Sequence, residues 1–119
     1  MDQGIVLLGH GSRDPLWHQP IESVAARIRE LQPQVAVRCA YLELSRPDLA
    51  AAVAELVASG VREIRALPMF LGVGKHARED LPLLVAQLRI TFPQIRIELL
   101  PALGEDPRLL ELVARIAIS

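Results

Sequence analysis

Two histidines and one glutamate in this chain carry side chains suited to binding a metal ion or moving a proton. His10 lies between two glycines, His76 ends a glycine-rich segment over residues 71–76, and Glu43 lies between them in the sequence. Neutral imidazole is a common ligand of borderline transition metals, and it titrates near neutral pH. Two imidazoles on neighbouring loops could hold one divalent ion or shuttle protons, and Glu43 could add a third, harder ligand or a base.

Other interpretations of these residues stay open. Each histidine could simply hydrogen-bond its own loop. Residues 72–77, Gly-Val-Gly-Lys-His-Ala, match a loose dinucleotide-binding fingerprint, but no acidic residue ends the next strand at the required distance. The histidine–glycine pair at residues 10–11 is similar to that of phosphohistidine phosphatases, which carry an arginine where this chain has Gly9.

Length and composition restrict the class of protein. The 119 residues fit one domain, and a hydrophobic fraction of 51% with 23% charged residues excludes a disordered chain. A net charge of −1 gives no general attraction to nucleic acid or membranes. The single cysteine, Cys39, excludes an internal disulfide framework, and the apolar run Ile5–Leu8 is too short for a signal peptide or a membrane span. We therefore expect a soluble cytoplasmic protein.

The first half of the chain predicts two strand–helix units. The continuous apolar run Gly4–Leu8 is typical of a strand buried on both faces, and apolar residues at helical spacing follow it as far as Leu31. Residues 34–41 predict the second strand. Ser45 and Asp48, three residues apart, indicate a capping box, with Pro47 in the first turn of a second helix that Gly60 ends.

The second half repeats the pattern. Residues 61–68 predict the third strand, followed by a loop that reaches Arg78 and a helix capped near Asp80, with Pro82 in its first turn. Residues 95–100 predict a fourth strand, and its alternating charges favour an edge position. Asp106 and Pro107 open a last helix.

Four such units within residues 1–119 predict one three-layer α/β domain with a four-stranded parallel sheet and helices on both faces. In the flavodoxin-like strand order 2-1-3-4, the connections after strands one and three leave in opposite directions. A crevice therefore opens at the carboxyl ends of these strands. The loops that carry His10 and His76 border this crevice, and the loop that carries Glu43 lies beside them.

Basic side chains gather in the same loops. Arg13, Arg46, Lys75 and Arg78 all follow predicted strands. Arginine and lysine at such a crevice could pair with carboxylates of a substrate. They could equally be ordinary solvated charges.

Three segments resemble the motifs of the class II tetrapyrrole chelatases, and most of all the short CbiX/SirB-type sirohydrochlorin chelatases. They are residues 5–13, Ile-Val-Leu-Leu-Gly-His-Gly-Ser-Arg; residues 41–47, Tyr-Leu-Glu-Leu-Ser-Arg-Pro; and residues 68–82, from Pro68 to Pro82. The resemblance spans nearly the whole chain. The third segment, with its glycines, histidine, aspartate and proline in order, is the most specific.

The resemblance implies insertion of a divalent metal into sirohydrochlorin, for cobalamin or siroheme synthesis. It implies that His10, His76 and Glu43 bind the metal and remove the pyrrole protons. The metal, Co²⁺, Fe²⁺ or Ni²⁺, is then a substrate, and no organic cofactor is needed. Sirohydrochlorin is a polycarboxylate, so we expect it to be contacted by the loop residues Ser12, Arg13, Arg46, Gly74, Lys75 and Arg78.

Long members of this family hold two copies of such a domain facing a cleft, and this chain holds one. The resemblance therefore implies a homodimer. From the net charge of −1, we expect no nucleic-acid or membrane partner. Cobalt insertion is the leading hypothesis, with ferrochelatase or nickelochelatase specificity as alternatives, because two imidazoles and a carboxylate accept all three metals. A metal- or tetrapyrrole-binding module without catalytic activity is the alternative of a different class.

Overall fold

Strand β1 (Gln3–Gly9) lies at the centre of a parallel sheet whose strand order is β2–β1–β3–β4, as predicted. The computed structural model describes residues 2–119. The other strands are β2 (Ala36–Tyr41), β3 (Glu63–Pro68) and β4 (Arg96–Leu99). The apolar side chains of residues 6–8 are fully buried because both faces of β1 are covered. Burial alternates along β4, which forms an edge of the sheet.

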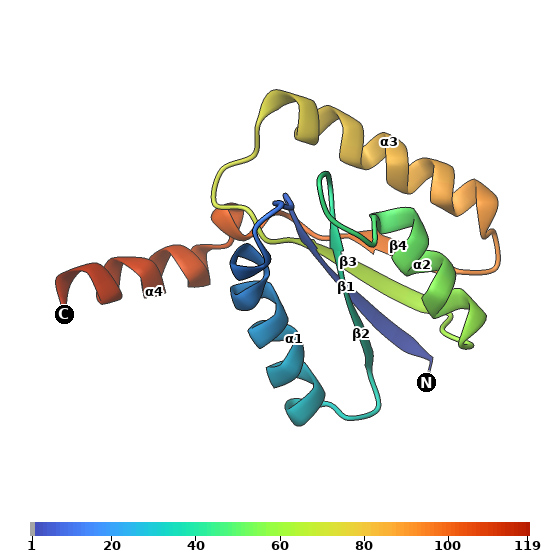
Figure 1. Cartoon of the computed structure of the whole chain (residues 1–119), viewed down its shortest axis with the longest axis horizontal. Helices are drawn as coiled ribbons and strands as arrows, with labels where there is room; N and C mark the ends of the chain where they lie inside the picture. Colours follow the sequence, from blue (N-terminus) through green and yellow to red (C-terminus); the bar gives the residue numbers. More distant parts are fainter. Residues whose placement is uncertain (1) are drawn as a thin grey trace.

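Helices cover both faces of the sheet (Figure 1). Helix α1 (Gln19–Leu31) packs on β1 and β2, where Ile21 and Ala25 join a core cluster with Leu7. Helices α2 (Leu49–Ala58) and α3 (Lys75–Thr91) cover the opposite face, where Leu56 and Val85 belong to the larger cluster. The strand order and these crossovers bring the carboxyl ends of β1, β2 and β3 to one end of the sheet.

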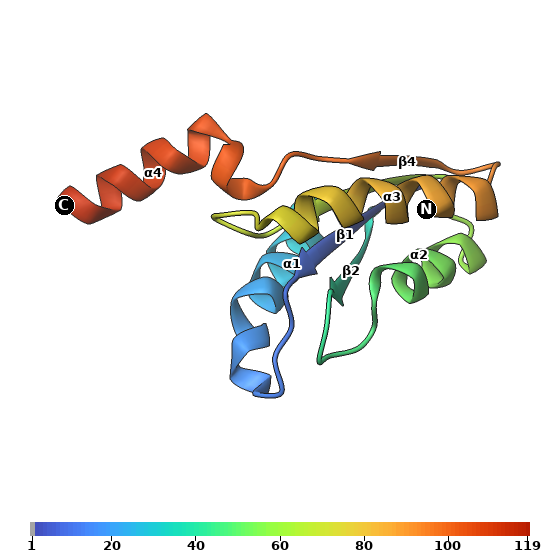
Figure 2. The same ribbon diagram turned by 90° about the horizontal axis from the view of Figure 1, so that it is seen from above.

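Helix α4 (Pro107–Ile118) extends away from the rest of the domain, and the second view shows it well clear of the sheet (Figure 2). None of its residues is buried, and the molecule measures 46 Å along its longest axis. Asp106 caps the helix by accepting a hydrogen bond from the Arg108 N–H, as its Asp-Pro start predicts. No helix within residues 2–119 has both the length and the apolar character needed to cross a membrane.

Two predicted helix starts are wrong. Asp48 alone caps α2, accepting from the Ala51 N–H, while Ser45 bonds elsewhere and Pro47 precedes the helix. Helix α3 begins after Gly74, five residues before the predicted cap, so that Pro82 lies inside it. Burial of the apolar stripe of α3, which begins at Leu81, outweighs the hydrogen bond that the proline cannot make. Strands β2 and β3 each begin two residues later than predicted.

A close backbone contact fixes the loop after β4. In the short 3-10 helix η2 (Leu103–Glu105), the Gly104 N–H donates to the Phe70 carbonyl oxygen over 3.0 Å. A Cβ atom at position 104 would overlap the Leu71 carbonyl. Only glycine therefore lets η2 lie against the segment that follows β3.

We expect Gly104→Ala to lower the free energy of unfolding by about 1–3 kcal/mol, because the added methyl group must push two backbone segments apart. Urea denaturation measures the change. Gly72→Ala is the matched control, since a Cβ at position 72 meets no atom within 4 Å and should change stability little. Equal stabilities of the two variants would show that the contact is not tight in solution.

Tyr41 makes stability depend on pH at the alkaline end. Its side chain is 5% exposed, and burial raises the pKa of its phenol to about 12, helped by the nearby Cys39 and Glu22. Between an unfolded pKa of about 10 and this value, the folded chain holds a proton that the unfolded chain has lost. The contribution of Tyr41 to the free energy of unfolding is therefore fully present below pH 10, and it is lost as the pH rises from about 10 to 12.

We expect the phenolate absorbance of this single tyrosine to develop well above pH 10 in the folded protein. The loss of stability across the window should reach about 2 kcal/mol. Tyr41→Phe removes the titrating group and should flatten this part of the profile. Burial also raises the pKa of the Cys39 thiol. Cys39→Ser therefore separates the contribution of the thiol to the pH dependence of stability from that of Tyr41. A phenol that titrates near pH 10 in protein that is still folded would contradict the assignment.

Candidate functional site

His10 follows β1 and is held on one face only. Its ring stacks on Phe70, with 4.1 Å between ring centroids and 28° between planes. Phe70 is 3% exposed and belongs to the larger core cluster, so it gives the imidazole a fixed support. The His10 side chain is otherwise exposed. The structure therefore sets the position of this ring while leaving its nitrogen atoms accessible.

Backbone contacts place Glu43 beside His10. The pairing of β1 with β2 continues past both strands, because the Leu42 N–H donates to Gly9 and the Glu43 N–H donates to the His10 carbonyl over 3.0 Å. Gly11 has a φ of 97°, and a Cβ atom there would overlap the Glu43 carbonyl. The distance between the two loops is thus fixed by a glycine that carries no chemistry itself.

Hydrogen bonds of the Ser45 side chain link the same two loops. Its hydroxyl donates to the Ser12 carbonyl over 2.7 Å and accepts from the Ser12 N–H over 3.0 Å. The Nε2 atom of His18 lies 2.9 Å from the same Oγ. Since the only hydroxyl proton is directed to Ser12, His18 must be the donor and carry its proton on Nε2. His18 therefore donates a hydrogen bond to Ser45 and does not act as a base toward it.

A cavity of about 670 Å³ brings the two motif histidines to one surface. It is lined by residues from the ends of β1 and β2 and from the start of α3, and we call it the His76 pocket. His10, Glu43, Gly74, Lys75 and His76 all border it. The helix begins at Lys75, so His76 and Arg78 lie in its first turn and not in a loop as predicted. Asp80 also lines this pocket, one turn beyond His76.

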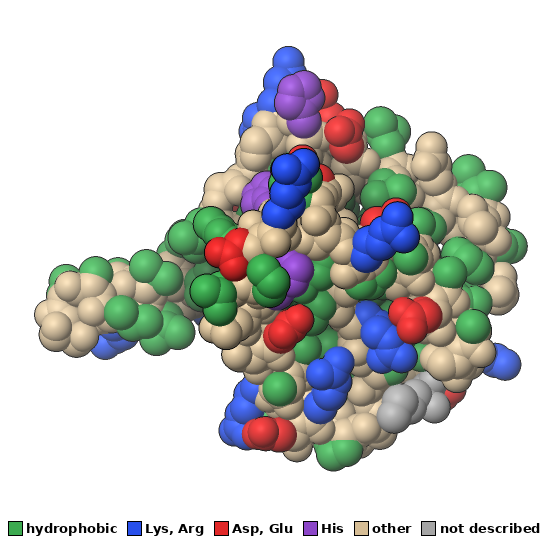
Figure 3. Space-filling model, viewed as in Figure 1, with side chains coloured by type: hydrophobic (Ala, Val, Ile, Leu, Met, Phe, Trp, Pro, Cys, Tyr) green, Lys and Arg blue, Asp and Glu red, His purple; other side chains and the backbone are tan. Residues whose placement is uncertain are grey.

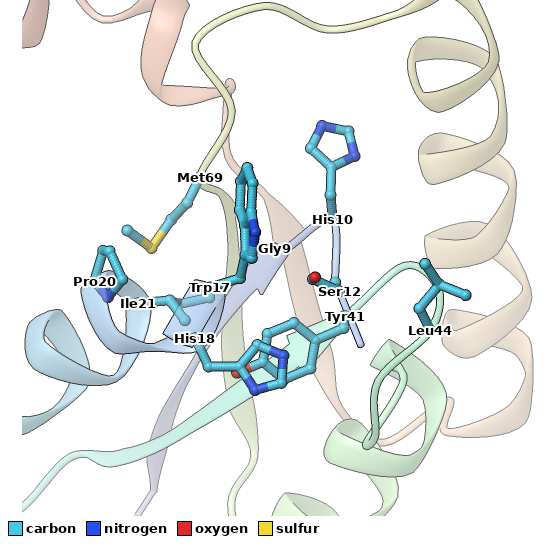
Figure 4. A pocket seen from close by; sticks show the side chains of 11 residues that line it. Gly9, His10, Ser12, Trp17, His18, Pro20, Ile21, Tyr41, Leu44 and Met69 are labelled. Atoms are coloured by element: carbon cyan, nitrogen blue, oxygen red, sulfur yellow. The ribbon is translucent and has the colours of Figure 1, made fainter. Parts of the chain in front are cut away.

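His10 also borders a second cavity of about 510 Å³, which we call the Trp17 pocket (Figure 4). Trp17 lies in the short 3-10 helix η1 (Pro15–His18), and its side chain is 72% exposed. Ser12, Tyr41 and Met69 contribute to the same wall. His18 and Tyr41 also line the pocket, and their rings stack with 4.3 Å between centroids. A broad, flat ligand with polar edges would fit between such aromatic and apolar surfaces.

The predicted substrate contacts separate into groups. Gly74 and Lys75 line the His76 pocket and Ser12 lines the Trp17 pocket, whereas Arg78 lines another cavity between α3 and the end of β4. Arg13 and Arg46 are exposed and belong to neither of the first two linings. Figure 3 shows histidine, lysine and arginine side chains on one face of the molecule.

The candidate metal ligands are not gathered into one cluster among the residues that the structure describes. Within residues 2–119, no three His, Cys, Asp or Glu side chains lie close enough together to hold a metal ion. His10, Glu43 and His76 share a pocket without forming a closed cluster.

Sequence reasoning missed several residues that shape this site. Ser45 was interpreted as a helix cap, and nothing in its local sequence indicates the partners 27 and 33 residues away. Phe70 carries no polar group that would mark it as a site residue, yet it belongs to the core and supports His10. Asp80 was interpreted as a cap. The spacing of four between His76 and Asp80 would have placed both on one face had the helix been predicted from Lys75.

Comparison with known proteins agrees with this geometry. The model of the CbiX family matches residues 4–118. A sirohydrochlorin cobaltochelatase of Methanococcoides burtonii is 35% identical over 79 residues, which are 66% of this chain and 60% of the relative. The chain thus spans about 60% of the length of this relative, and 61% and 54% of two further sirohydrochlorin cobaltochelatases.

Two solved structures share the whole fold. A CbiX protein of cobalamin (vitamin B12) biosynthesis from Marinobacter aquaeolei VT8 matches with a TM-score of 0.80 at 33% identity, covering 98% of this chain and 93% of that chain. The sirohydrochlorin chelatase SirB from Bacillus subtilis subspecies spizizenii, in complex with cobalt, matches with a TM-score of 0.79 at 26% identity, covering 97% of this chain but 49% of that chain. Sequence and structure therefore lead to one assignment, and the chain belongs to the CbiX family.

Proposed function

We propose that this protein is a sirohydrochlorin chelatase that inserts a divalent metal, Co²⁺ before Fe²⁺ or Ni²⁺, into its tetrapyrrole substrate. One observation carries the proposal: His10 and His76, from distant parts of the sequence, border the same cavity as Glu43. The names of the relatives, and the cobalt in the SirB structure, favour cobalt and sirohydrochlorin.

The proposed reaction needs groups that exchange a metal ion for two protons. Both pyrrole N–H protons of the substrate must leave as the metal enters its centre, so that the charge gained with the metal is offset by the protons lost. A neutral imidazole can hold the incoming ion through one ring nitrogen, and it can take a proton once the ion has moved on. His10 and His76 fill these roles in the proposal, and Glu43 serves as ligand or base.

The two pockets suggest how the substrate lies. His10 borders both, so a macrocycle over the Trp17 pocket would present its centre near the His76 pocket. Lys75 and the backbone at Gly74 would bind substrate carboxylates at one side, and Ser12 with Arg13 and Arg46 at the other. Arg78 lines a neighbouring cavity at the start of α3, and it stays a candidate contact on the side of Lys75.

A second copy of the chain would complete the cleft. This domain corresponds to 49% of the SirB chain, so a two-fold dimer would present two such surfaces to one substrate. In the proposal, the second copy closes the His76 pocket. The homodimer is part of the proposal.

We expect His10→Ala and His76→Ala each to lower kcat for metal insertion at least about 100-fold, because each removes a ligand and a base. Glu43→Gln should lower it less, since the amide keeps the shape and loses the charge. Insertion of Co²⁺ and of Fe²⁺ into sirohydrochlorin is followed by absorbance, corrected for the uncatalysed rate. Circular dichroism should show unchanged folds.

Glu79→Ala is the matched control, because Glu79 is exposed beside His76 on α3 and lies outside the pocket lining. It should insert metal at the rate of the unmodified protein. Near-normal rates in both histidine variants would refute the assigned roles. An unmodified protein that binds metal or tetrapyrrole stoichiometrically but never accelerates insertion would be a binding module and not an enzyme.

A further inference from the structure

Two large apolar side chains, Trp17 and Leu44, are left uncovered beside His10. Trp17 is 72% exposed and Leu44 is 58% exposed, and neither belongs to a core cluster. Both line the Trp17 pocket, and Figure 4 shows them on opposite sides of His10. One exposed apolar residue needs no explanation, but two that flank a candidate catalytic residue offer a surface on which an apolar ligand can lie.

Leu44 adopts a backbone conformation that is unfavourable for leucine. Its φ of 61° lies in the left-handed region, where Cβ crowds the following carbonyl, and it is the only residue other than glycine within residues 2–119 that has a positive φ. On one side of it, the Glu43 N–H donates to the His10 carbonyl. On the other side, the Ser45 hydroxyl donates to the Ser12 carbonyl. The hydrogen bonds of its two neighbours therefore hold Leu44 in the strained conformation.

Packing within the chain does not offset the strain at Leu44. Leu42, two residues earlier, packs against the larger core cluster, whereas Leu44 lines the Trp17 pocket and packs on neither cluster. Glu43 lines the His76 pocket, so adjacent residues of one loop border two different cavities. Strained residues that the surrounding structure holds in place cluster at ligand-binding sites. The conformation therefore indicates a function for the Leu44 side chain in the Trp17 pocket.

Trp17 is exposed, but its backbone is held in place. It lies in η1, where the Asp14 carboxylate accepts a hydrogen bond from the Leu16 N–H. The Asp14 carbonyl accepts from the Trp17 N–H over 3.1 Å, and the Asp14 N–H donates to the Ser12 hydroxyl. The indole is thus presented from an ordered turn, which reduces the entropy lost when a ligand contacts it.

The charges around this apolar surface indicate what kind of ligand it takes. Arg13 follows Ser12 and Arg46 follows Ser45, and the two serines are hydrogen-bonded to each other, so the two arginines begin at neighbouring points of the two loops. Both arginines are exposed, and neither forms an ion pair within residues 2–119. Unpaired guanidinium groups bind carboxylates. A flat ligand with an apolar face and carboxylates at its edge therefore matches both features.

We propose that Trp17 and Leu44 bind the face of the tetrapyrrole from either side of His10, and that the strained backbone of Leu44 is retained for this contact. The two side chains cover outer rings of the macrocycle, so that its centre lies at His10 and its carboxylates reach the arginines. The inference rests on the chelatase function proposed above. It names side chains that select the tetrapyrrole and not the metal.

Trp17→Ala tests the contact through the kinetic constants. We expect KM for sirohydrochlorin to rise about tenfold, while kcat and KM for Co²⁺ change less than about twofold, because the indole carries no metal ligand. Trp17→Phe should restore most of the affinity. Leu16→Ala is the matched control, since Leu16 is 65% exposed in the same turn and lies outside the pocket lining. An unchanged KM in Trp17→Ala would overturn the proposal, and so would its sedimentation as a smaller species, which would place the indole against a second copy.

Leu44→Asn separates the strain from the contact. Asparagine is similar to leucine in size and adopts the left-handed conformation more readily. We expect the urea midpoint of unfolding to rise, and KM for sirohydrochlorin to rise about fivefold because the apolar contact is lost. A higher midpoint with an unchanged KM would show that the strain serves no binding role. A midpoint that does not rise would show that the conformation is not strained, and either result would overturn the inference.

Binding of sirohydrochlorin without metal, followed by its absorbance, separates failure of this inference from failure of the proposed function. Weaker binding by Trp17→Ala and Leu44→Asn, with no metal insertion by the unmodified protein, would uphold the surface and reject the chelatase. Metal insertion with one KM in all variants would uphold the chelatase and reject the surface. An unmodified protein that does not bind sirohydrochlorin would reject both.

Discussion

The position of β1 between β2 and β3 is the constraint on which the site depends. β1 pairs in parallel with both neighbours, so the chain must leave its carboxyl end toward one face and leave β3 toward the other. The two departing segments cannot fill the space between them. His10 and Glu43 enter this space from the ends of β1 and β2, and His76 enters it from the start of α3. The candidate site residues meet at this end of the sheet because the strand connectivity opens a cavity there.

Support for the two histidines differs. His10 stacks on a buried aromatic ring and lies on a loop tied by Ser45 and spaced by Gly11. His76 lies exposed in the first turn of α3, behind a glycine that caps the helix without a side-chain hydrogen bond. In the proposed reaction, the supported ring of His10 would set the position of the incoming metal, and the less constrained ring of His76 could adjust to it.

Much of the fold follows from the sequence because the signals are local. The continuous apolar run of β1, the edge character of β4 and the Asp-Pro start of α4 each reflect a few neighbouring residues, and the structure confirms all three. The start of α3 was wrong because Pro82 resembles a first-turn proline, whereas the buried stripe starting at Leu81 keeps the helix intact around it. The bonds of Ser45 and the spacing role of Gly104 join residues about 30 apart, and no local pattern contains that information. His10, Glu43 and His76 were predicted to lie together because the strand order brings their loops to one end of the sheet, and they do line one cavity. The resemblance singles out the same three residues.

The spacing glycines bear on how the sequence can vary. Gly11 and Gly104 touch no substrate in the proposed reaction, yet an added methyl group at either would overlap a carbonyl of another loop. Gly72 and Gly74, inside the segment that looks most like a ligand-binding motif, have open space around them. A survey of tolerated substitutions would therefore rank Gly11 and Gly104 beside His10 and His76, and it would pass over Gly72. Intolerance to change in this domain marks the residues that hold surfaces apart as well as those that do the chemistry, and only the geometry distinguishes them.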